Sequence, residues 1–179
     1  MTSDRDRRLL LTLAREAIRA CVGIAPAHQP APSAVLDVPG GAFVTLHKHG
    51  ELRGCIGHIE PNEPLGEVVA RCAVAAATTD PRFPPITVAE LQQIEIEISL
   101  LGLLEPIHGP DEIEIGRHGL VVEHRWQRGL LLPQVATEWK WDADTFLAQT
   151  CHKAGLPLDA WKRGARVFRF EAEVFGEPG

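Results

Sequence analysis

The residues most able to carry chemistry cluster in the stretch Leu52–Gly57, which reads LRGCIG. Gly54 and Gly57 flank Cys55, and glycine inside a strand often marks a bulge or a close approach of the backbone to a ligand. Arg53 and Cys55 lie two residues apart, so on an extended strand they face the same side, and the cation favours the thiolate. This pattern predicts a nucleophilic or thiol-binding role for Cys55. The alternative is a small buried cysteine whose neighbouring glycines only relieve crowding.

A second candidate is the loop Asp80–Pro85, which contains three prolines in six residues. Because proline restricts the backbone, we expect Asp80, Arg82 and Phe83 to be held in fixed positions. The functional interpretation is a rigid binding loop. The structural interpretation is a corner in which Asp80 caps a backbone group and Arg82 pairs internally.

Other polar and aromatic residues form weaker patterns. His118 begins a predicted strand, where an imidazole can act as a base or a hydrogen-bond donor, or can simply be a satisfied structural histidine. Gln134 follows a proline and precedes Trp139 and Trp141, which could line a pocket or a partner surface, although aromatic core packing is the commoner explanation.

Metal and cofactor motifs are missing from the sequence. His47, His49 and His58 crowd one predicted hairpin, but no third ligand at characteristic spacing accompanies them, so we predict no metal site. The chain has no dinucleotide-binding or phosphate-binding glycine loop, no nucleophile elbow and no HExxH pair. We therefore predict no cofactor.

Composition bounds the class of protein. The 179 residues, of which 45% are hydrophobic and 23% charged, suit one globular domain. The net charge of −6 opposes a nucleic-acid partner, and no apolar run is long enough to span a membrane. Four scattered cysteines without a secretory signal predict reduced thiols and a cytoplasmic location. Three of them lie on apolar helix faces and are assigned to the core: Cys21, Cys72 and Cys151.

Periodicity predicts the elements that must position these residues. Helices are expected from Ser3 to Cys21 with a Ser3 cap, from an Asn62 cap to Thr78, and from Phe146 to Gly155. Residues 26–39 are expected to form an extended surface connection.

Strand patterns complete the expected fold. Hairpins are predicted for 42–48 with 51–58 and for 119–123 with 130–132. Alternation places Ile94, Ile96, Ile98 and Leu100 on one buried face, and likewise Phe168, Phe170, Ala172 and Val174. The order of elements lacks βαβ alternation and predicts an α+β fold with an antiparallel sheet.

Five ordered blocks resemble the AMMECR family, also called AmmeMemoRadiSam system protein A. They are LRGCIG at 52–57, DPRFPP at 80–85, residues 116–120, LPQV at 132–135, and Cys151 with KAGLP at 153–157. The resemblance spans nearly the whole chain, 1–179. It implies a single α+β domain of two unequal lobes, with an antiparallel sheet, flanking helices and a cleft between the lobes near the LRGCIG segment.

The resemblance also implies site residues and partners. Cys55 and His118 are carried over as catalytic candidates, and the ligand-binding candidates are Arg53, Gly54, Gly57, Asp80, Arg82, Phe83 and Gln134. Members of the family occur beside or fused to Memo-like and radical-SAM proteins, which suggests such partners. The family supplies no established reaction.

Two functions remain open at this point. In the first, the chain is an enzyme or enzyme component that binds an unidentified small ligand beside Cys55, with the thiol as nucleophile or tether and His118 assisting proton transfer. In the second, it is a non-catalytic adaptor whose rigid loops and tryptophans dock a Memo-like or radical-SAM partner. RNA binding ranks third because the chain is acidic.

Overall fold

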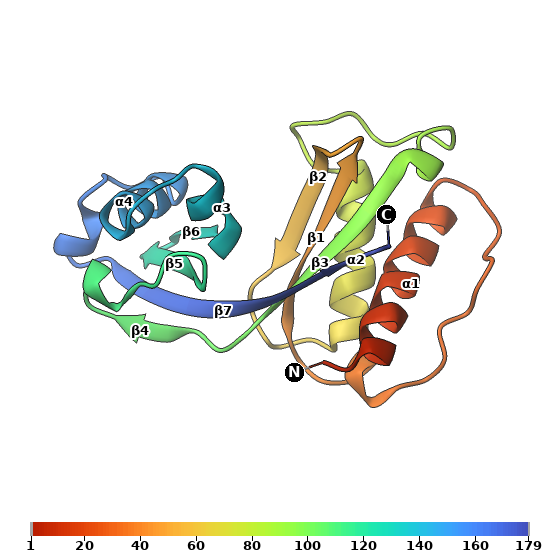
Figure 1. Ribbon diagram of the computed structural model, residues 1–179, viewed down its shortest axis with the longest axis horizontal. Coiled ribbons are helices and arrows are strands. Elements are labelled where there is room, and N and C mark those ends of the chain that lie inside the picture. The colour runs from red at the N-terminus through yellow and green to blue at the C-terminus, as the bar shows by residue number, and fades with distance from the viewer. Residues whose placement is uncertain (1, 179) are drawn as a thin grey trace. The chain divides into compact units, whose positions relative to one another are not determined.

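The computed structural model describes residues 2–178, and their contacts divide the chain into two compact units. Unit 1 contains the residues up to Leu101 and those from Glu173 onward, and unit 2 contains Gly102–Ala172. Both units combine helices with antiparallel strands (Figure 1), which confirms the predicted α+β class. The cleft between two lobes stays a prediction.

Helix α1 (Asp4–Cys21) begins where its capping pattern predicts. The Ser3 hydroxyl accepts a hydrogen bond from the Asp6 backbone N–H at 3.1 Å, which satisfies one of the unpaired donors of the first turn. The helix ends before Gly23, whose φ of 84° is left-handed. The fully buried side of the helix consists of Leu10, Ala14 and Ile18.

Strands β1 (Gly41–Lys48) and β2 (Glu51–His58) form the first predicted hairpin. His49 and Gly50 connect them with φ values of 53° and 79°, as a two-residue type I′ turn requires. The register shifts once, because Leu46 pairs with Gly54 while His47 pairs with Leu52. Arg53 is therefore the additional residue of a β-bulge.

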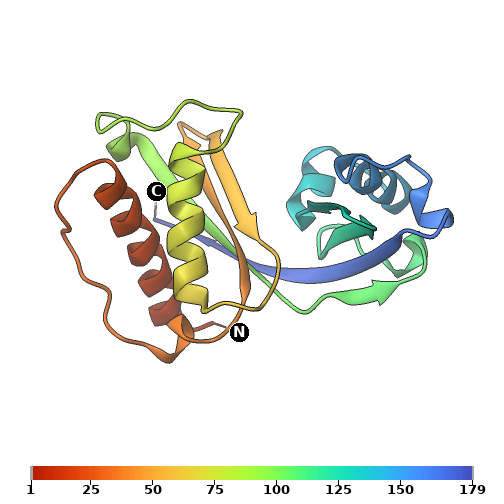
Figure 2. The same cartoon turned by 180° about the vertical axis from the view of Figure 1, so that it is seen from behind.

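Strand β3 (Ile94–Leu101) pairs with the other edge of β1, and the strand order in unit 1 is β2-β1-β3-β7. Helices α1 and α2 (Leu65–Thr78) lie side by side on one face of these strands (Figures 1 and 2). The core between the two layers is closed by the even-numbered side chains Val44, Leu46, Ile96 and Ile98, all essentially fully buried.

The predicted cap of α2 is wrong. The helix begins after Pro64, which makes no side-chain capping bond, and the Asn62 side chain instead lies 2.9 Å from His58 Nε2. An isolated β-bridge between Pro39 and Pro64 fixes the main chain at this point, so tertiary pairing sets the start of the helix. The preceding segment, 26–39, contains a single 3₁₀ turn at Ala34–Leu36 and is otherwise irregular, as predicted.

Unit 2 has the strand order β7-β5-β6, with β4 paired to β7. Helix α4 packs on β5 and β6 and buries Phe146, Leu147 and Cys151 completely. The second predicted hairpin and the third predicted helix are confirmed. The elements are β4 (Glu105–Ile107), β5 (His118–His124), β6 (Gln127–Leu131), α3 (Pro133–Glu138), α4 (Ala143–Lys153) and β7 (Arg166–Gly176), and 3₁₀ turns lie at Pro110–Glu112 and Ala160–Lys162.

Two burial predictions need correction. Cys72 and Cys151 are buried as predicted, but Cys21 is exposed because it is the last residue of α1, just before the chain turns at Gly23. On β7, Val174 is 42% exposed while Phe175 packs into the core of unit 1. Val167, also odd-numbered, packs into the core of unit 2, so the side of this strand that was predicted to be wet supplies a residue to each core. No helix within residues 2–178 is long and apolar enough to cross a membrane.

Gly54 gives a direct test of the packing in unit 1. A Cβ at this position would lie 2.2 Å from the Ala76 backbone oxygen of α2, so Gly54→Ala forces the helix away from the sheet. We expect the free energy of unfolding to fall by about 1–3 kcal/mol, the usual effect of overpacking.

The matched control is Gly40→Ala, whose Cβ would meet only the Leu65 side chain, at an ordinary 3.4 Å. Urea unfolding of both variants checks the prediction. Equal stability of the two variants would contradict the close approach of α2 to β2.

Candidate functional site

The thiol of Cys55 lies in a row of polar side chains that crosses three strands of unit 1. Because Gly54 faces α2, the next residue, Cys55, faces the opposite side of the sheet. Thr45 is its partner on β1, and the Thr45 hydroxyl lies 3.2 Å from the sulfur. Glu97 on β3 is in turn the partner of Thr45. The row places a half-buried thiol between a hydroxyl and the loop that follows α2.

Asp80 fixes the main chain at this thiol. Its carboxylate is 4% exposed and accepts a hydrogen bond from the Cys55 backbone N–H at 3.0 Å. It also accepts from Arg82 through the backbone N–H, Nε and Nη2, at 2.8–3.1 Å. The Arg82 guanidinium, followed by these backbone donors, holds the pKa of Asp80 far below its usual range. The structural interpretation of this loop, a capped backbone with an internally paired arginine, is thus confirmed.

A second ion pair joins the bulge of β2 to the same loop. Arg53 donates from Nε and Nη2 to the two carboxylate oxygens of Glu90, each at 3.2 Å, and Lys48 Nζ lies 3.0 Å from Glu90 Oε1. Burial raises the pKa of Glu90, but these donors and the Thr87 N–H outweigh it and lower the value to about 2. The pair remains charged at neutral pH.

Phe83 lies beside both arginines. The guanidinium carbons of Arg53 and Arg82 are 5.9 Å and 5.4 Å from the centre of its ring, within cation–π range. Nη1 of Arg53 is buried without a hydrogen-bond partner in residues 2–178. Arg82 has half of its side chain exposed.

The two glycines of LRGCIG have packing reasons. A Cβ on Gly54 would collide with α2, and one on Gly57 would enter the Phe43 ring at 2.4 Å. The structure therefore gives both glycines the role of relieving crowding, as the structural interpretation proposed. Their direct contact with a ligand stays a prediction.

The expected thiolate at Cys55 is not what the surroundings favour. Burial raises the pKa of the thiol, and the nearby carboxylates of Asp80 and Glu97 raise it further, against the lowering effects of Thr45 and Arg82. The cation expected to act on the sulfur, Arg53, is instead engaged by Glu90. The sequence spacing failed here because the bulge at Arg53 breaks the simple alternation of the strand.

His118 and Gln134 belong to unit 2, whereas the other candidate residues belong to unit 1. His118 is 6% exposed, and its Nδ1 accepts a hydrogen bond from the Glu114 backbone N–H at 2.9 Å. Burial lowers the pKa of His118, and the guanidinium groups of Arg169 and Arg117 lower it further. A catalytic pairing of His118 with Cys55, and ligand binding by Gln134, stay predictions.

The histidines of the first hairpin do not converge. His58 contacts Asn62, and within residues 2–178 no three His, Cys, Asp or Glu side chains are grouped to hold a metal ion.

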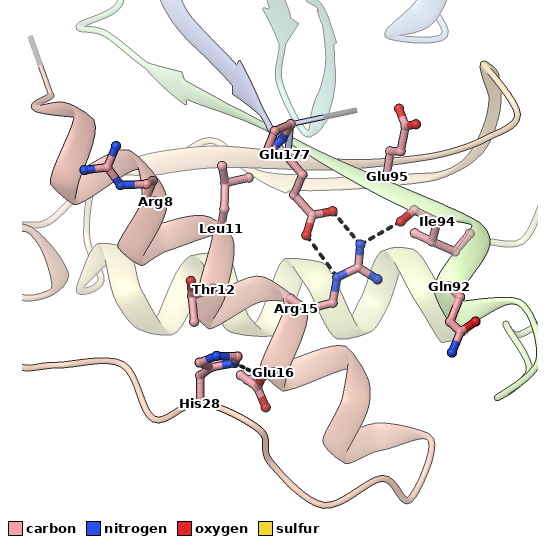
Figure 3. Close-up of a pocket in the computed structure, with 11 residues that line it drawn as sticks. Arg8, Leu11, Thr12, Arg15, Glu16, His28, Gln92, Ile94, Glu95 and Glu177 are labelled. Carbon is pink, nitrogen blue, oxygen red and sulfur yellow. Dashed lines mark hydrogen bonds and ion pairs between the residues drawn. The ribbon is translucent and has the colours of Figure 1, made fainter.

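A cavity of about 590 Å³ in unit 1 was not predicted (Figure 3). It lies between α1, the start of β3 and the chain at 177–178. At its centre Arg15 donates to the carbonyl oxygens of Leu91 and Ile94, at 2.9 Å and 2.6 Å, and pairs with Glu177. Glu177 also accepts a hydrogen bond from the Ile96 N–H. The pair of Arg15 and Glu177 therefore joins the chain at residue 177 to α1. The interruption of the apolar stripe at Arg15 was the available sequence signal.

These features define a class: an α+β protein with a half-buried cysteine on a bulged hairpin, tied by two ion pairs to a proline-rich loop. The model of the AMMECR1 family matches residues 11–175. The chain therefore belongs to the AMMECR1 family.

Similar proteins come from archaea. A protein of Methanothermobacter thermautotrophicus is 52% identical over 146 residues, covering 78% of this chain and 76% of that protein. One from Methanosarcina acetivorans is 42% identical over 187 residues, covering 99% and 94%. The crystal structure of the uncharacterized protein PH0010 from Pyrococcus horikoshii is similar with a TM-score of 0.85 and 42% identity, over 94% of this chain and 89% of that one. These relatives establish the family and the fold, but they assign no reaction to it.

The row formed by Cys55, Thr45 and Glu97 predicts that two substitutions shift the pKa of Cys55 in opposite directions. Thr45→Val removes the hydroxyl that stabilises the thiolate, so the pKa of Cys55 should rise. Glu97→Gln removes a repelling carboxylate, so the pKa should fall. The measurement is the rate of alkylation by iodoacetamide against pH, with modified sites read by mass spectrometry.

The exposed Cys21 of the same molecules is the internal control and should titrate identically in all variants. Shifts of the same sign for Thr45→Val and Glu97→Gln would refute the arrangement of the row.

Proposed function

We propose that this chain binds a small ligand beside Cys55, and that the thiol recognises or tethers this ligand. The observation that carries the proposal is the buried Asp80 carboxylate, which holds the Cys55 main chain and the Arg82 side chain at once. One carboxylate thus ties the main chain at the thiol to a half-exposed guanidinium. The raised pKa of Cys55 favours a protonated thiol at rest, so we propose recognition or reversible tethering and no nucleophilic turnover.

The ligand should carry a hydrogen-bond acceptor, such as a carboxylate or an amide oxygen. Arg82 uses Nε and Nη2 on Asp80, which leaves Nη1 as a donor toward an incoming group. The ring of Phe83 adds an apolar wall that lies within cation–π distance of both arginines. Thr45 supports the thiol from the sheet side.

Disulfide exchange tests the proposal with three probes of equal length. The mixed disulfides that 3-mercaptopropionate, 3-mercaptopropionamide and propanethiol form with one common thiol differ only in the group that would meet Arg82. In each exchange the Cys55 thiolate attacks the sulfur of the probe half, a new disulfide forms, and the common thiol leaves. We expect the carboxylate and amide probes to be retained on Cys55 about threefold or more over the alkyl probe, the effect of one hydrogen bond.

The same ratio measured on the exposed Cys21 is the reference, and Arg82→Gln should reduce the preference on Cys55 to that reference. Equal retention of all three probes on Cys55 would refute the proposal and leave the site with a structural role only.

A second candidate function is docking of a partner protein through unit 2. Trp139 is 68% exposed and is stacked on Trp141, with the ring centres 6.1 Å apart. An exposed aromatic on a rigid support is typical of interface hot spots. The family resemblance suggests a Memo-like or radical-SAM protein as the partner.

Trp139→Ser should weaken binding of a Memo-like protein by tenfold or more, since a hot-spot residue contributes about 2 kcal/mol. Trp126→Ser is the matched control, because Trp126 is 82% exposed on the β5–β6 turn. Titration of the purified proteins gives the two affinities. Equal affinities of both variants and the parent chain would reject this surface.

A further inference from the structure

Unit 2 contains a polar cavity of about 310 Å³ that is independent of the Cys55 site. Its walls come from the segment 105–114, from the start of β5 and from β7. His118, the first residue of β5, is one of the residues that line it. The size suits a molecule as small as an amino-acid derivative.

The hydrogen bonding of His118 determines what it can offer to the cavity. A backbone N–H can only donate, so the bond from Glu114 N–H requires a lone pair on Nδ1. The proton of the neutral ring then lies on Nε2. No group within residues 2–178 accepts a hydrogen bond from Nε2, although the residue is more than nine-tenths buried and lines the cavity. His118 therefore presents one directed donor, and its Nε2 has no lone pair for a metal ion or for a base.

The charges around this donor are mostly negative. Five carboxylates and two guanidinium groups line the cavity, which gives a formal charge of −3 with His118 neutral. Arg117 is paired with Glu114 and Glu171, and Arg169 with Glu105. Asp111 and Glu112, by contrast, have no ion pair within residues 2–178, and the Glu112 carboxylate is already engaged by the His108 backbone N–H. A simple anion would be repelled here.

A simple cation would leave the Nε2–H donor of His118 without an acceptor. A ligand that satisfies both features carries a positive amine and, close to it, an uncharged acceptor oxygen. We propose that this cavity binds small amino amides, with the carbonyl oxygen on His118 Nε2–H and the ammonium group toward Asp111. A neutral donor suits an amide carbonyl, because no charged group is desolvated at that contact.

Three probes distinguish binding of the amine from binding of the carbonyl oxygen. Glycinamide carries both the amine and the carbonyl, ethylamine carries only the amine, and acetamide only the carbonyl. Each is titrated into ¹⁵N-labelled protein, and the shifts of the His118 ring and of unit 2 amides give the dissociation constants. Glycinamide should bind at least threefold more tightly than ethylamine, while acetamide should bind more weakly than both.

Two substitutions of His118 give a matched pair. In His118→Asn the side-chain oxygen can replace Nδ1 and keep the contact with Glu114, while the donor that Nε2–H supplies is lost. In His118→Gln the side-chain amide nitrogen can replace Nε2 and keep this donor. We expect His118→Asn to weaken glycinamide binding about threefold to tenfold, His118→Gln to stay within about twofold, and Asp111→Asn to weaken both amines.

A purely structural role for His118 predicts the reverse order, with His118→Gln the more damaging variant and no difference between glycinamide and ethylamine. That result would overturn the proposal. The experiment is separate from the Cys55 test, because His118→Asn should leave the retention of the disulfide probes unchanged.

Discussion

The buried carboxylate of Asp80 is the interaction on which the arrangement of unit 1 around Cys55 depends. An unpaired charge at 4% exposure would be strongly destabilising, so its stability rests on the donors that Cys55 and Arg82 supply. Because one of those donors is the main chain of β2, the carboxylate ties the loop after α2 to the strand that carries Cys55.

The pair of Arg53 and Glu90 adds a second tie between the same two segments. Most of the LRGCIG motif can then be understood as architecture: the arginine holds the loop, Gly54 admits α2, and Gly57 admits Phe43. The Cys55 side chain has no comparable architectural role. The thiol contacts a hydroxyl and is half-buried. These surroundings suit recognition of a ligand by the neutral thiol better than stabilisation of a thiolate.

A similar restriction applies to the imidazole of unit 2. The amide of Glu114 fixes the tautomer of His118, and burial with two arginines keeps the ring neutral. In this state the residue donates a hydrogen bond and has no lone pair with which to remove a proton. The thiol and the imidazole are thus both neutral groups at rest, and both proposed sites recognise ligands through hydrogen bonds.

The sequence by itself determined helices α1, α2 and α4, the two hairpins, the α+β class and the family, because caps, turn residues and hydrophobic periodicity are local signals. It also located the loop at Asp80, since three prolines restrict the backbone wherever they occur. Only the tertiary structure decided the partner of Arg53, the exposure of Cys21 and the start of α2. Arg53 pairs with Glu90, 37 residues along the chain, and α2 begins where Pro64 bridges Pro39, so these two features depend on contacts between distant segments. The exposure of Cys21 follows from its place as the last residue of α1.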